Sequence, residues 1–493
     1  MSDIGSLLDR LARTRSTHPA LHWVPFDGPG RSWTYGELVR DIYRLAAELQ
    51  RRGVSVGDRV VILGDNSPDI MRAWAAVPLL GAIAVSLNAR STVDELRWYG
   101  SHAAPVGAIV QPSRADDLGQ AMPDLRWVIS DVDAVLTSDA DVQRPSTDPA
   151  RPASVLYTSG TTARPKAVVW THANCRWAGA IGAAHQSLRP SDINLIHLPL
   201  FHTNALSYSL LSTWHAGATV VLQPRFSASR FWDVSVRYGC TWTSIVTFVE
   251  RALSSHPSPG RHAYRGMGHS RCTPVGAGPG GVGTVGWYGM TETVSHPIVG
   301  APADRAGSMG RPAPEYDVAV LSDDGIPVGP GESGSLLVRG VPGVSMFAGY
   351  LGDDAATAAA YTDDGWFRTG DRVRLDEEGT ITFVERDKDV LKVGGENVGA
   401  PEIERVLLSV PGVVEAAVVG RPDAMLGDVP VAFVVVSDGT VVVAAIEAVC
   451  EALLPPFKRP REIRVITELP RATLGKVAKA QLRDWAQTAE PPT

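Results

Sequence analysis

Cysteine is scarce in this chain, and its spacing argues against two kinds of site. The four cysteines, Cys175, Cys240, Cys272 and Cys450, are far apart in the 493-residue sequence, and no two of them form a C-x-x-C pair. Disulfide frameworks and structural zinc sites both need closely patterned cysteines. We therefore expect neither, and we expect the protein to work in a reducing cytoplasm.

Long apolar runs and a basic excess are also missing. No stretch of 18 consecutive apolar residues occurs, so we expect no membrane span. The N-terminal segment has no long apolar core followed by a cleavage site, so we expect no signal peptide. The formal net charge of −7 argues against a nucleic-acid-binding surface. With 44% hydrophobic and 20% charged residues, the composition is that of an ordinary globular protein.

Lysine is the least used of the common charged residues. Only six lysines stand among the 46 basic residues, so arginine is the default cation. Four of the six lie in stretches that look like motifs, namely Lys166, Lys388, Lys392 and Lys476. We interpret these four as candidates for specific roles.

Small hydroxyl-bearing residues and glycine dominate the segment YTSGTTARPKAVVWTH, which covers residues 157–172. The apolar residues 154–157 before it are typical of a strand end. A loop of small residues lets backbone N–H groups and hydroxyls reach phosphate oxygens, and a following lysine adds positive charge. The segment therefore predicts a phosphate-binding loop, whose candidate residues are Thr158, Ser159, Gly160, Thr161, Thr162 and Lys166.

This loop closely resembles the phosphate-binding signature of the adenylate-forming enzymes, which include acyl-CoA synthetases, luciferases and the adenylation domains of peptide synthetases. The family form is YTSGTTGxPKGV, and here Ala163 and Ala167 stand where it has glycines. Further stretches resemble other signatures of the family in the same order and over nearly the whole chain. They are LPLFHT at 198–203, YGMTE at 288–292, TGD at 369–371, the charged segment 384–404 and the PRATLGK segment at 470–476.

The resemblance implies an α/β fold with two parts. A large N-terminal domain of layered α/β subdomains would cover residues 1–386, and a small mobile C-terminal α+β domain would cover residues 387–493. The residue pattern agrees, because residues 31–53 have helical spacing of apolar residues and residues 59–64 read as a buried strand. Alternating helices and strands of this kind predict a mostly parallel sheet.

The YGMTE stretch supplies the nucleotide contacts that the resemblance implies. Tyr288, with Gly289 and Met290, would lie against the adenine. The hydroxyl of Thr291 would reach the α-phosphate, and Glu292 would hold Mg²⁺, which takes one or two protein carboxylates together with phosphate oxygens.

Other signatures extend this set towards the ribose and the acid. Asp371 and Arg386 would hold the ribose, and His202 would border the acyl pocket. Residues 242–248 and Asn204 are candidates for the lining of that pocket.

The C-terminal signatures imply a hinge and a catalytic lysine. Lys388 would be the hinge, and Lys476 would take the place of the catalytic lysine. Beside Lys392, the glycines Gly394 and Gly395 would let a ligand approach the backbone closely.

The implied activity is that of an acyl-CoA synthetase. A carboxylic acid reacts with ATP to give acyl-AMP and pyrophosphate, and coenzyme A then displaces AMP. The implied cofactors are ATP/AMP, Mg²⁺ and coenzyme A, and the partners are small molecules, with a homodimer also allowed. Three alternatives stay open: a ligase that performs mainly the thioester-forming step, an adenylation enzyme that loads a carrier protein, and a non-catalytic nucleotide-binding relative.

Two departures from the family pattern suggest an altered nucleotide site. An alanine held at positive φ would cost roughly 1–2 kcal/mol, so Ala163 and Ala167 predict weak handling of ATP relative to AMP. Residues 260–286 hold nine glycines, and we expect the helix that the family places there to be missing. We assign no adenine contacts within that segment.

Overall fold

A computed structural model describes residues 3–136, 141–158, 164–386, 390–437, 443–471 and 477–488. The chain divides into two compact units. The first consists of Met1–Ala89, Tyr99–Tyr157 and Ala167–Glu385, and the second consists of Arg90–Trp98, Thr158–Lys166 and Arg386–Thr493.

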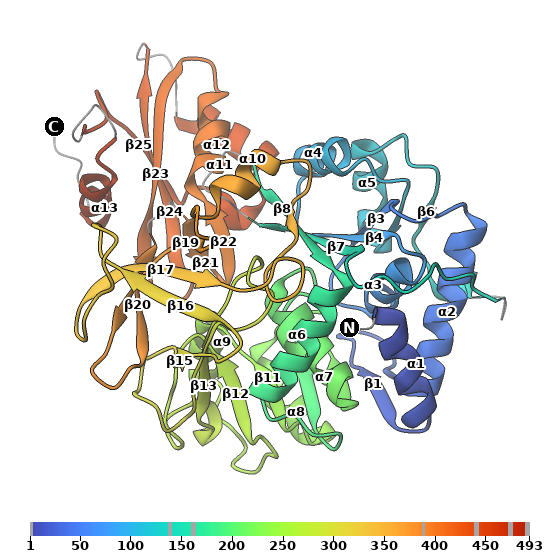
Figure 1. Ribbon diagram of the computed structural model, residues 1–493. Coiled ribbons are helices and arrows are strands. Elements are labelled where there is room, and N and C mark those ends of the chain that lie inside the picture. The colour runs from blue at the N-terminus through green and yellow to red at the C-terminus, as the bar shows by residue number, and fades with distance from the viewer. Residues whose placement is uncertain are drawn as a thin grey trace. The chain divides into compact units, whose positions relative to one another are not determined.

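A seven-stranded sheet forms the N-terminal layer of the first unit, with the strand order β18-β8-β7-β4-β3-β5-β6 (Figure 1). Its strands β3 to β7 pair in parallel, as the alternation of helices and strands predicts. Their bounds are β3 (Arg59–Leu63), β4 (Ile83–Leu87), β5 (Gly107–Val110), β6 (Val128–Ile129), β7 (Pro152–Thr158), β8 (Lys166–Thr171) and β18 (Gly349–Tyr350).

The helices of this layer begin where the sequence supplies capping residues. Helix α2 (Tyr35–Arg51) starts after Thr34, whose hydroxyl accepts from the backbone N–H of Glu37 while the Glu37 carboxylate bonds back to Thr34. Its apolar face is buried, including Leu38 and Leu45. The other helices are α1 (Ile4–Thr14), α3 (Pro68–Leu79) and α5 (Ala115–Ala121), while α4 (Val93–Ala103) begins in residues assigned to the second unit and ends in the first.

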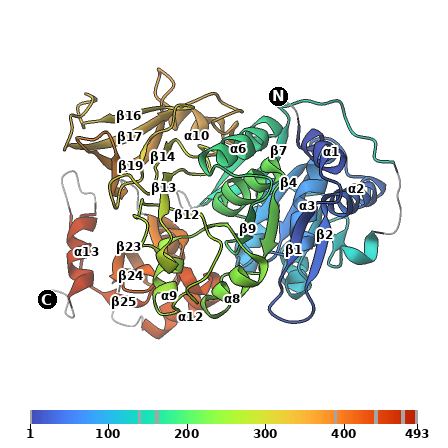
Figure 2. The same cartoon turned by 90° about the horizontal axis from the view of Figure 1, so that it is seen from below.

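A nine-stranded sheet forms the next layer, with the strand order β15-β14-β13-β12-β11-β9-β10-β1-β2 (Figure 2). Its central strands are parallel. The bounds are β1 (Pro19–Trp23), β2 (Arg31–Thr34), β9 (Ile193–Ile196), β10 (Thr219–Leu222), β11 (Trp242–Ser244), β12 (Gly266–His269), β13 (Thr284–Tyr288), β14 (Ile298–Val299) and β15 (Arg311–Pro312).

Five helical segments accompany this sheet. They are α6 (His172–His185), the π-helix η3 (Asn204–Leu211), α7 (Ser212–Ala216), α8 (Ala228–Tyr238) and α9 (Thr247–Ser254).

Two glycines in β12 make room for aromatic side chains of the neighbouring strands. A side chain at Gly266 would lie 2.5 Å from the Trp242 ring, and one at Gly268 would lie 1.5 Å from the Trp287 ring. Both indoles therefore pack directly on the backbone of β12. The connection from β12 to β13, which is described throughout, contains one short 3₁₀ turn (Pro279–Gly281) and no α-helix, as the glycine-rich sequence suggests.

A four-stranded sheet completes the first unit. Its strands are β16 (Asp317–Leu321), β17 (Ser333–Arg339), β19 (Phe367–Leu375) and β20 (Ile381–Arg386), in that order. The short helix α10 (Asp354–Ala359) precedes β19 in the chain.

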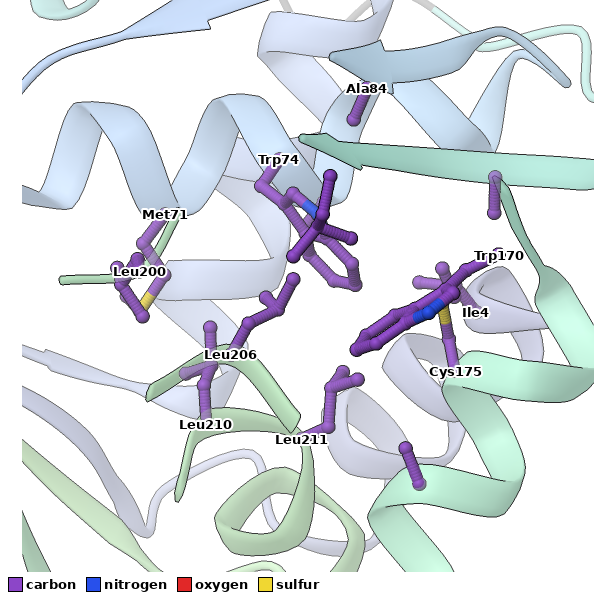
Figure 3. Close-up of a cluster of buried hydrophobic side chains, with 14 of the residues drawn as sticks. Ile4, Met71, Trp74, Ala84, Trp170, Cys175, Leu200, Leu206, Leu210 and Leu211 are labelled. Carbon is purple, nitrogen blue, oxygen red and sulfur yellow. The ribbon is translucent and has the colours of Figure 1, made fainter. Parts of the chain in front are cut away.

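The main hydrophobic core lies between the two large sheets. Figure 3 shows the indoles of Trp74 on α3 and Trp170 on β8 among leucines of η3, including Leu206 and Leu211. All four are at most 3% exposed, and full burial of such a side chain contributes roughly 1.5–3 kcal/mol. This packing fixes η3, which carries residues of the candidate site.

The second unit has its own core around a five-stranded sheet. The strands are β21 (Val390–Val393), β22 (Glu396–Gly399), β23 (Val413–Asp423), β24 (Gly427–Val436) and β25 (Glu462–Val465). Its helices include α11 (Ala400–Leu408), α12 (Val443–Leu453) and α13 (Lys479–Gln487), and α13 packs against β23 (Figure 2). This α+β unit and the layered α/β unit agree with the predicted fold class.

Two sequence-based expectations about composition can be compared with the structure. All four cysteines are free and buried. No helix in the described part of the chain combines the length and apolar character that a membrane span requires.

Candidate active site

Strand β13 delivers the YGMTE segment to the carboxyl edge of the nine-stranded sheet, where its first residue meets β19. The Tyr288 hydroxyl donates to Oδ2 of Asp371 at 2.6 Å. The backbone N–H of Asp371 donates to the hydroxyl of Thr369 at 3.1 Å, so the aspartate is held from two sides. Asp371 is fully buried within a strand, and the fold thus joins two predicted site residues that are 83 positions apart.

After Tyr288 the chain forms a tight turn. The backbone N–H of Met290 donates to the hydroxyl of Thr293 at 3.0 Å, and Val294 has a φ of 63°. A β-branched residue in the left-handed region is strained. The Ser207 hydroxyl of η3 donates to the carbonyl oxygen of Val294 at 2.7 Å and fixes this conformation.

Two signatures meet at Thr291. The Thr203 hydroxyl, next to His202, donates to Oγ1 of Thr291 at 2.9 Å. The indole N–H of Trp170 donates to the Thr291 carbonyl oxygen at 2.8 Å. His202 is half-buried, with its ring edge-on to that of Phe201 at 4.7 Å. The structure therefore brings LPLFHT beside YGMTE.

Glu292 is 5% exposed and is oriented by a tyrosine that the sequence did not point to. The Tyr350 hydroxyl donates to Oε1 of Glu292 at 2.9 Å. Burial, with the negative charge of Glu292 as the next cause, raises the pKa of Tyr350 far above its ordinary value, so this hydroxyl remains a donor. Burial likewise raises the pKa of Tyr361, with Glu292 as a further cause. No motif-like spacing singled out either tyrosine.

The residues expected to line the acyl pocket begin at η3. A π-helix is rare and is often associated with function. Its first residue, Asn204, accepts from the Ser244 hydroxyl at 2.6 Å, so the two candidate linings of the acyl pocket are in contact. A small, mainly apolar pocket also lies beneath LPLFHT. It is lined by residues of α3, β3, β4 and η3, including Met71, Trp74 and Leu206, and by Phe201 of the LPLFHT segment.

Part of the phosphate-loop prediction can be compared with the structure. Thr158 ends β7, and its hydroxyl donates to the carbonyl oxygen of Lys166 at 3.5 Å. Ser159, Gly160, Thr161, Thr162 and Ala163 lie outside the described residues.

Ala167 contradicts the expectation of backbone strain. It lies inside β8, is 3% exposed, and is not among the non-glycine residues with positive φ. Its carbonyl oxygen accepts from the backbone N–H of Leu351 at 2.8 Å, which is ordinary extended pairing. Extended backbone suits alanine, so the argument for weak ATP handling fails at this position.

The C-terminal candidates lie in the second unit. Lys392 is exposed on β21, and its backbone N–H donates to Oδ2 of Asp428 at 3.1 Å. Gly394 and Gly395 have φ of 59° and 91° and form the two-residue turn between β21 and β22, which explains glycine at both positions. The backbone of Arg386 ends β20. The Arg386 side chain, Lys388 and Lys476 lie outside the described residues.

The carboxylate of Glu292 fits a magnesium ion that arrives with a nucleotide. In the described residues no group of three or more His, Cys, Asp or Glu side chains could hold a metal by itself. Mg²⁺ commonly uses one or two carboxylates and takes its other oxygens from phosphates and water. One buried, hydrogen-bonded carboxylate beside the Thr291 hydroxyl has the chemistry for such a shared site.

A tyrosine, a threonine and a carboxylate close together in the chain, with a buried aspartate behind the tyrosine, form the arrangement that the resemblance to adenylate-forming enzymes predicts. The family models agree. AMP-binding enzyme matches residues 8–351, and AMP-binding enzyme C-terminal domain matches residues 402–476. The chain belongs to the AMP-binding enzyme family, which confirms the resemblance and the predicted class of AMP-forming acid–thiol ligases.

Several characterised proteins are similar over their full length. A crotonobetaine/carnitine–CoA ligase of Salmonella choleraesuis (strain SC-B67) is 31% identical, with 98% of this chain and 99% of that protein covered. The o-succinylbenzoate CoA synthetase of Bacillus subtilis, solved with its product analogue, is 29% identical with a TM-score of 0.84 over 97% of this chain and 98% of that one. A Mycobacterium tuberculosis fatty acyl CoA synthetase is 27% identical with a TM-score of 0.69 over 99% of both chains.

Proposed function

We propose that the chain converts a carboxylic acid into its coenzyme A thioester in two steps. A carboxylate oxygen of the acid attacks the α-phosphorus of ATP, the bond to the β-phosphate oxygen breaks, and pyrophosphate leaves. The thiolate of coenzyme A then attacks the acyl carbon, and AMP leaves with the electron pair of the broken C–O bond. The thiol proton passes to solvent.

The observation that supports this proposal most directly is the arrangement of Thr291 and Glu292 on one turn. The Thr203 bond orients the Thr291 hydroxyl, and the Tyr350 bond orients the Glu292 carboxylate. Groups fixed before the reaction stabilise developing charge without further reorganisation. We assign Thr291 to the α-phosphate and Glu292 to Mg²⁺, which would neutralise phosphate charge when bound.

Tyr288 and Asp371 form the nucleoside side of the proposal. The Asp371 carboxylate accepts from Tyr288 through one oxygen, and a carboxylate can accept several hydrogen bonds. We assign Asp371 to the ribose hydroxyls, as the family resemblance implies, and acidic residues have this role in other nucleotide sites. Arg386, Lys388, Lys476 and the loop residues 159–162 keep the roles that the family resemblance implies.

The names of the relatives do not determine the acid. They include a crotonobetaine/carnitine ligase, an o-succinylbenzoate synthetase and an anthranilate CoA ligase solved with anthranoyl-AMP. Coenzyme A is the thiol in each of these names, and we propose it as the acceptor here. We also propose a cytoplasmic location, based on the four free thiols. We further propose that the protein forms a homodimer, and light scattering can test this.

Mass spectrometry on a panel of carboxylic acids with ATP, Mg²⁺ and coenzyme A tests the proposal. We expect acyl-AMP and acyl-CoA for at least one acid, together with pyrophosphate. If the thioester forms only when acyl-AMP is supplied, the protein is a ligase that performs mainly the thioester-forming step. Transfer to a carrier protein but not to coenzyme A would identify a carrier-loading enzyme, and AMP binding without any product would contradict catalysis.

A further inference from the structure

Four buried polar groups gather behind the YGMTE segment without a hydrogen-bond partner in the described structure. They are the Tyr208 hydroxyl, the Trp242 indole N–H, the Ser295 hydroxyl and Nε2 of His296. Each of these residues is at most 4% exposed. We call these four residues the polar floor.

The members of the polar floor are close neighbours from three elements. The rings of Tyr208 on η3 and His296 after the turn have centroids 3.9 Å apart. Trp287 stacks on His296 at 4.5 Å with an interplanar angle of 17°, and it shares one buried cluster with Tyr208 and Trp242. Ser295 precedes His296 in the chain, so η3, β11 and the turn after β13 all contribute.

Unpaired polar groups in a protein interior are unfavourable, because they lose their bonds to water without replacing them. Native structures contain few of them, and each one calls for an explanation. Other buried polar atoms in the described residues also lack a partner, but these four are close neighbours around the YGMTE segment, and this clustering favours a shared function.

A chain of hydrogen bonds determines which role His296 can play. Glu315 is a carboxylate and accepts from Nε2 of His185 at 3.2 Å. Nδ1 of His185 then accepts from Nδ1 of His296 at 3.4 Å. Because its proton is on Nδ1, His296 presents a lone pair at Nε2. Burial, with the nearby His185 as a further cause, lowers the pKa of His296 well below its ordinary value and keeps the ring neutral.

The position of the polar floor relates it to the acid. A side chain at Gly289 would lie 2.3 Å from the Tyr208 hydroxyl, so this hydroxyl lies directly behind the backbone between Tyr288 and Thr291. The acid becomes attached to the α-phosphate, for which Thr291 is the proposed contact.

We propose that the polar floor is a recognition subsite for a hydroxyl group on the acid, and that the substrate is a hydroxylated aromatic carboxylic acid. The proposal rests on the proposed function of the same site. A substrate hydroxyl can donate to Nε2 of His296 and accept from the Tyr208 hydroxyl or the Trp242 indole N–H. Aromatic rings surround these groups, because Trp287, Tyr208 and His296 pack against one another, and such surroundings favour an aromatic substrate ring over an aliphatic chain.

The test compares matched acids in two assays. Benzoate, its 3- and 4-hydroxy derivatives and the corresponding methoxy derivatives are measured by calorimetric binding and by ATP–pyrophosphate exchange. We expect a hydroxylated acid to exceed benzoate by about 10–100-fold, because a site with unpaired polar groups rejects the analogue that cannot satisfy them. A methoxy group cannot donate to His296, so its derivatives should fall to the level of benzoate.

Protein variants identify which groups cause the preference for the hydroxylated acid. In Tyr208→Phe we expect the preference for the hydroxylated acid to fall about 10-fold. Tyr264→Phe is the matched control, because the Tyr264 hydroxyl is also buried but bonds to Ser235 at 2.7 Å. Equal binding and exchange for hydroxylated and plain acids, or an unchanged preference in Tyr208→Phe, would overturn the subsite. If none of the acids supports ATP–pyrophosphate exchange while binding still favours the hydroxylated acid, the proposed function is contradicted and the subsite is not.

Discussion

The proposed nucleotide end and the proposed acyl end of the candidate site differ in how their polar groups are paired. At the nucleotide end, Tyr288 bonds to Asp371, Thr203 to Thr291, and Tyr350 to Glu292. At the acyl end, the polar floor has unpaired groups under nearly complete burial in the described structure. In our proposal the paired groups position the nucleotide, whereas the unpaired groups receive the hydroxyl of the acid.

The largest effect should come from the charge at the nucleotide end. Glu292→Gln keeps the shape and loses the carboxylate, so we expect ATP–pyrophosphate exchange to fall by about 10²–10³-fold. The preference among acids should change less than about twofold, because the polar floor is untouched. Glu378→Gln, which alters an exposed side chain, is the control. A changed preference in Glu292→Gln would show that the two ends are not separate.

A smaller effect should follow from loosening Glu292 without removing it. Tyr350→Phe deletes a hydrogen bond to a charged group, which typically contributes about 1.5–3 kcal/mol. We expect the Mg²⁺ concentration for half-maximal exchange to rise about tenfold, and calorimetric affinity for Mg²⁺-ATP to fall in parallel.

Tyr361→Phe is the matched variant for this prediction. The Tyr361 hydroxyl is buried near Glu292 but has no hydrogen-bond partner in the described residues, so its loss should change the Mg²⁺ requirement less than threefold. Equal effects of the two substitutions would mean that the Tyr350 bond does not orient the carboxylate.

How much of this site the sequence predicts depends on whether its residues belong to a local pattern. Tyr288, Thr291, Glu292 and Asp371 lie in short signatures, and the structure brings all four together. Tyr350 acts through a partner 58 positions away, and no local spacing reveals such a pair.

The acyl end was harder to predict. The sequence marks the region 242–248 and Asn204 as candidates, and Trp242 is part of the polar floor. It does not mark Tyr208 or His296, because an aromatic residue on a helix and a single histidine after a turn are usually core residues. Their relation depends on the π-helix and on the positive φ of Val294, neither of which has a clear sequence signal.

The fold was more accessible, because repeated periodicities specify it. Apolar spacing and a capping box mark α2, and alternating helices and strands imply the parallel sheet. The error at Ala167 came from transferring a glycine requirement of the family to a residue that lies in extended backbone.

A third prediction concerns pH and should give a small effect. His296 faces His185 on α6, Tyr208 on η3 and, through His185, Glu315. Since burial lowers its pKa well below the ordinary value, His296 stays neutral from pH 8 down to pH 6 and keeps its acceptor at Nε2. We expect the ratio of exchange rates for hydroxylated and plain acids to change less than twofold over this range. A preference that disappears near pH 6.5 would show an accessible histidine that titrates normally.

The smallest effect on activity should come from Ala167→Gly. Because Ala167 has extended backbone in β8, glycine offers no relief of strain there. We expect exchange within twofold of the wild type, with a loss of roughly 0.5–1 kcal/mol in unfolding free energy from the added flexibility. Exchange and chemical denaturation measure the two quantities. A marked gain in exchange would restore the idea of an impaired phosphate loop.

The most direct test of the division between the two ends removes a hydroxyl from the protein and from the substrate, separately and together, and compares the resulting losses in rate. Values of kcat/KM for ATP–pyrophosphate exchange are measured for wild type, Tyr208→Phe and Glu292→Gln, each with 4-hydroxybenzoate, 3-hydroxybenzoate and benzoate. We predict that Tyr208→Phe costs the better hydroxylated acid about tenfold more than benzoate, while Glu292→Gln lowers all three acids by the same factor. Equal losses for all acids in Tyr208→Phe, or unequal losses in Glu292→Gln, would contradict the account.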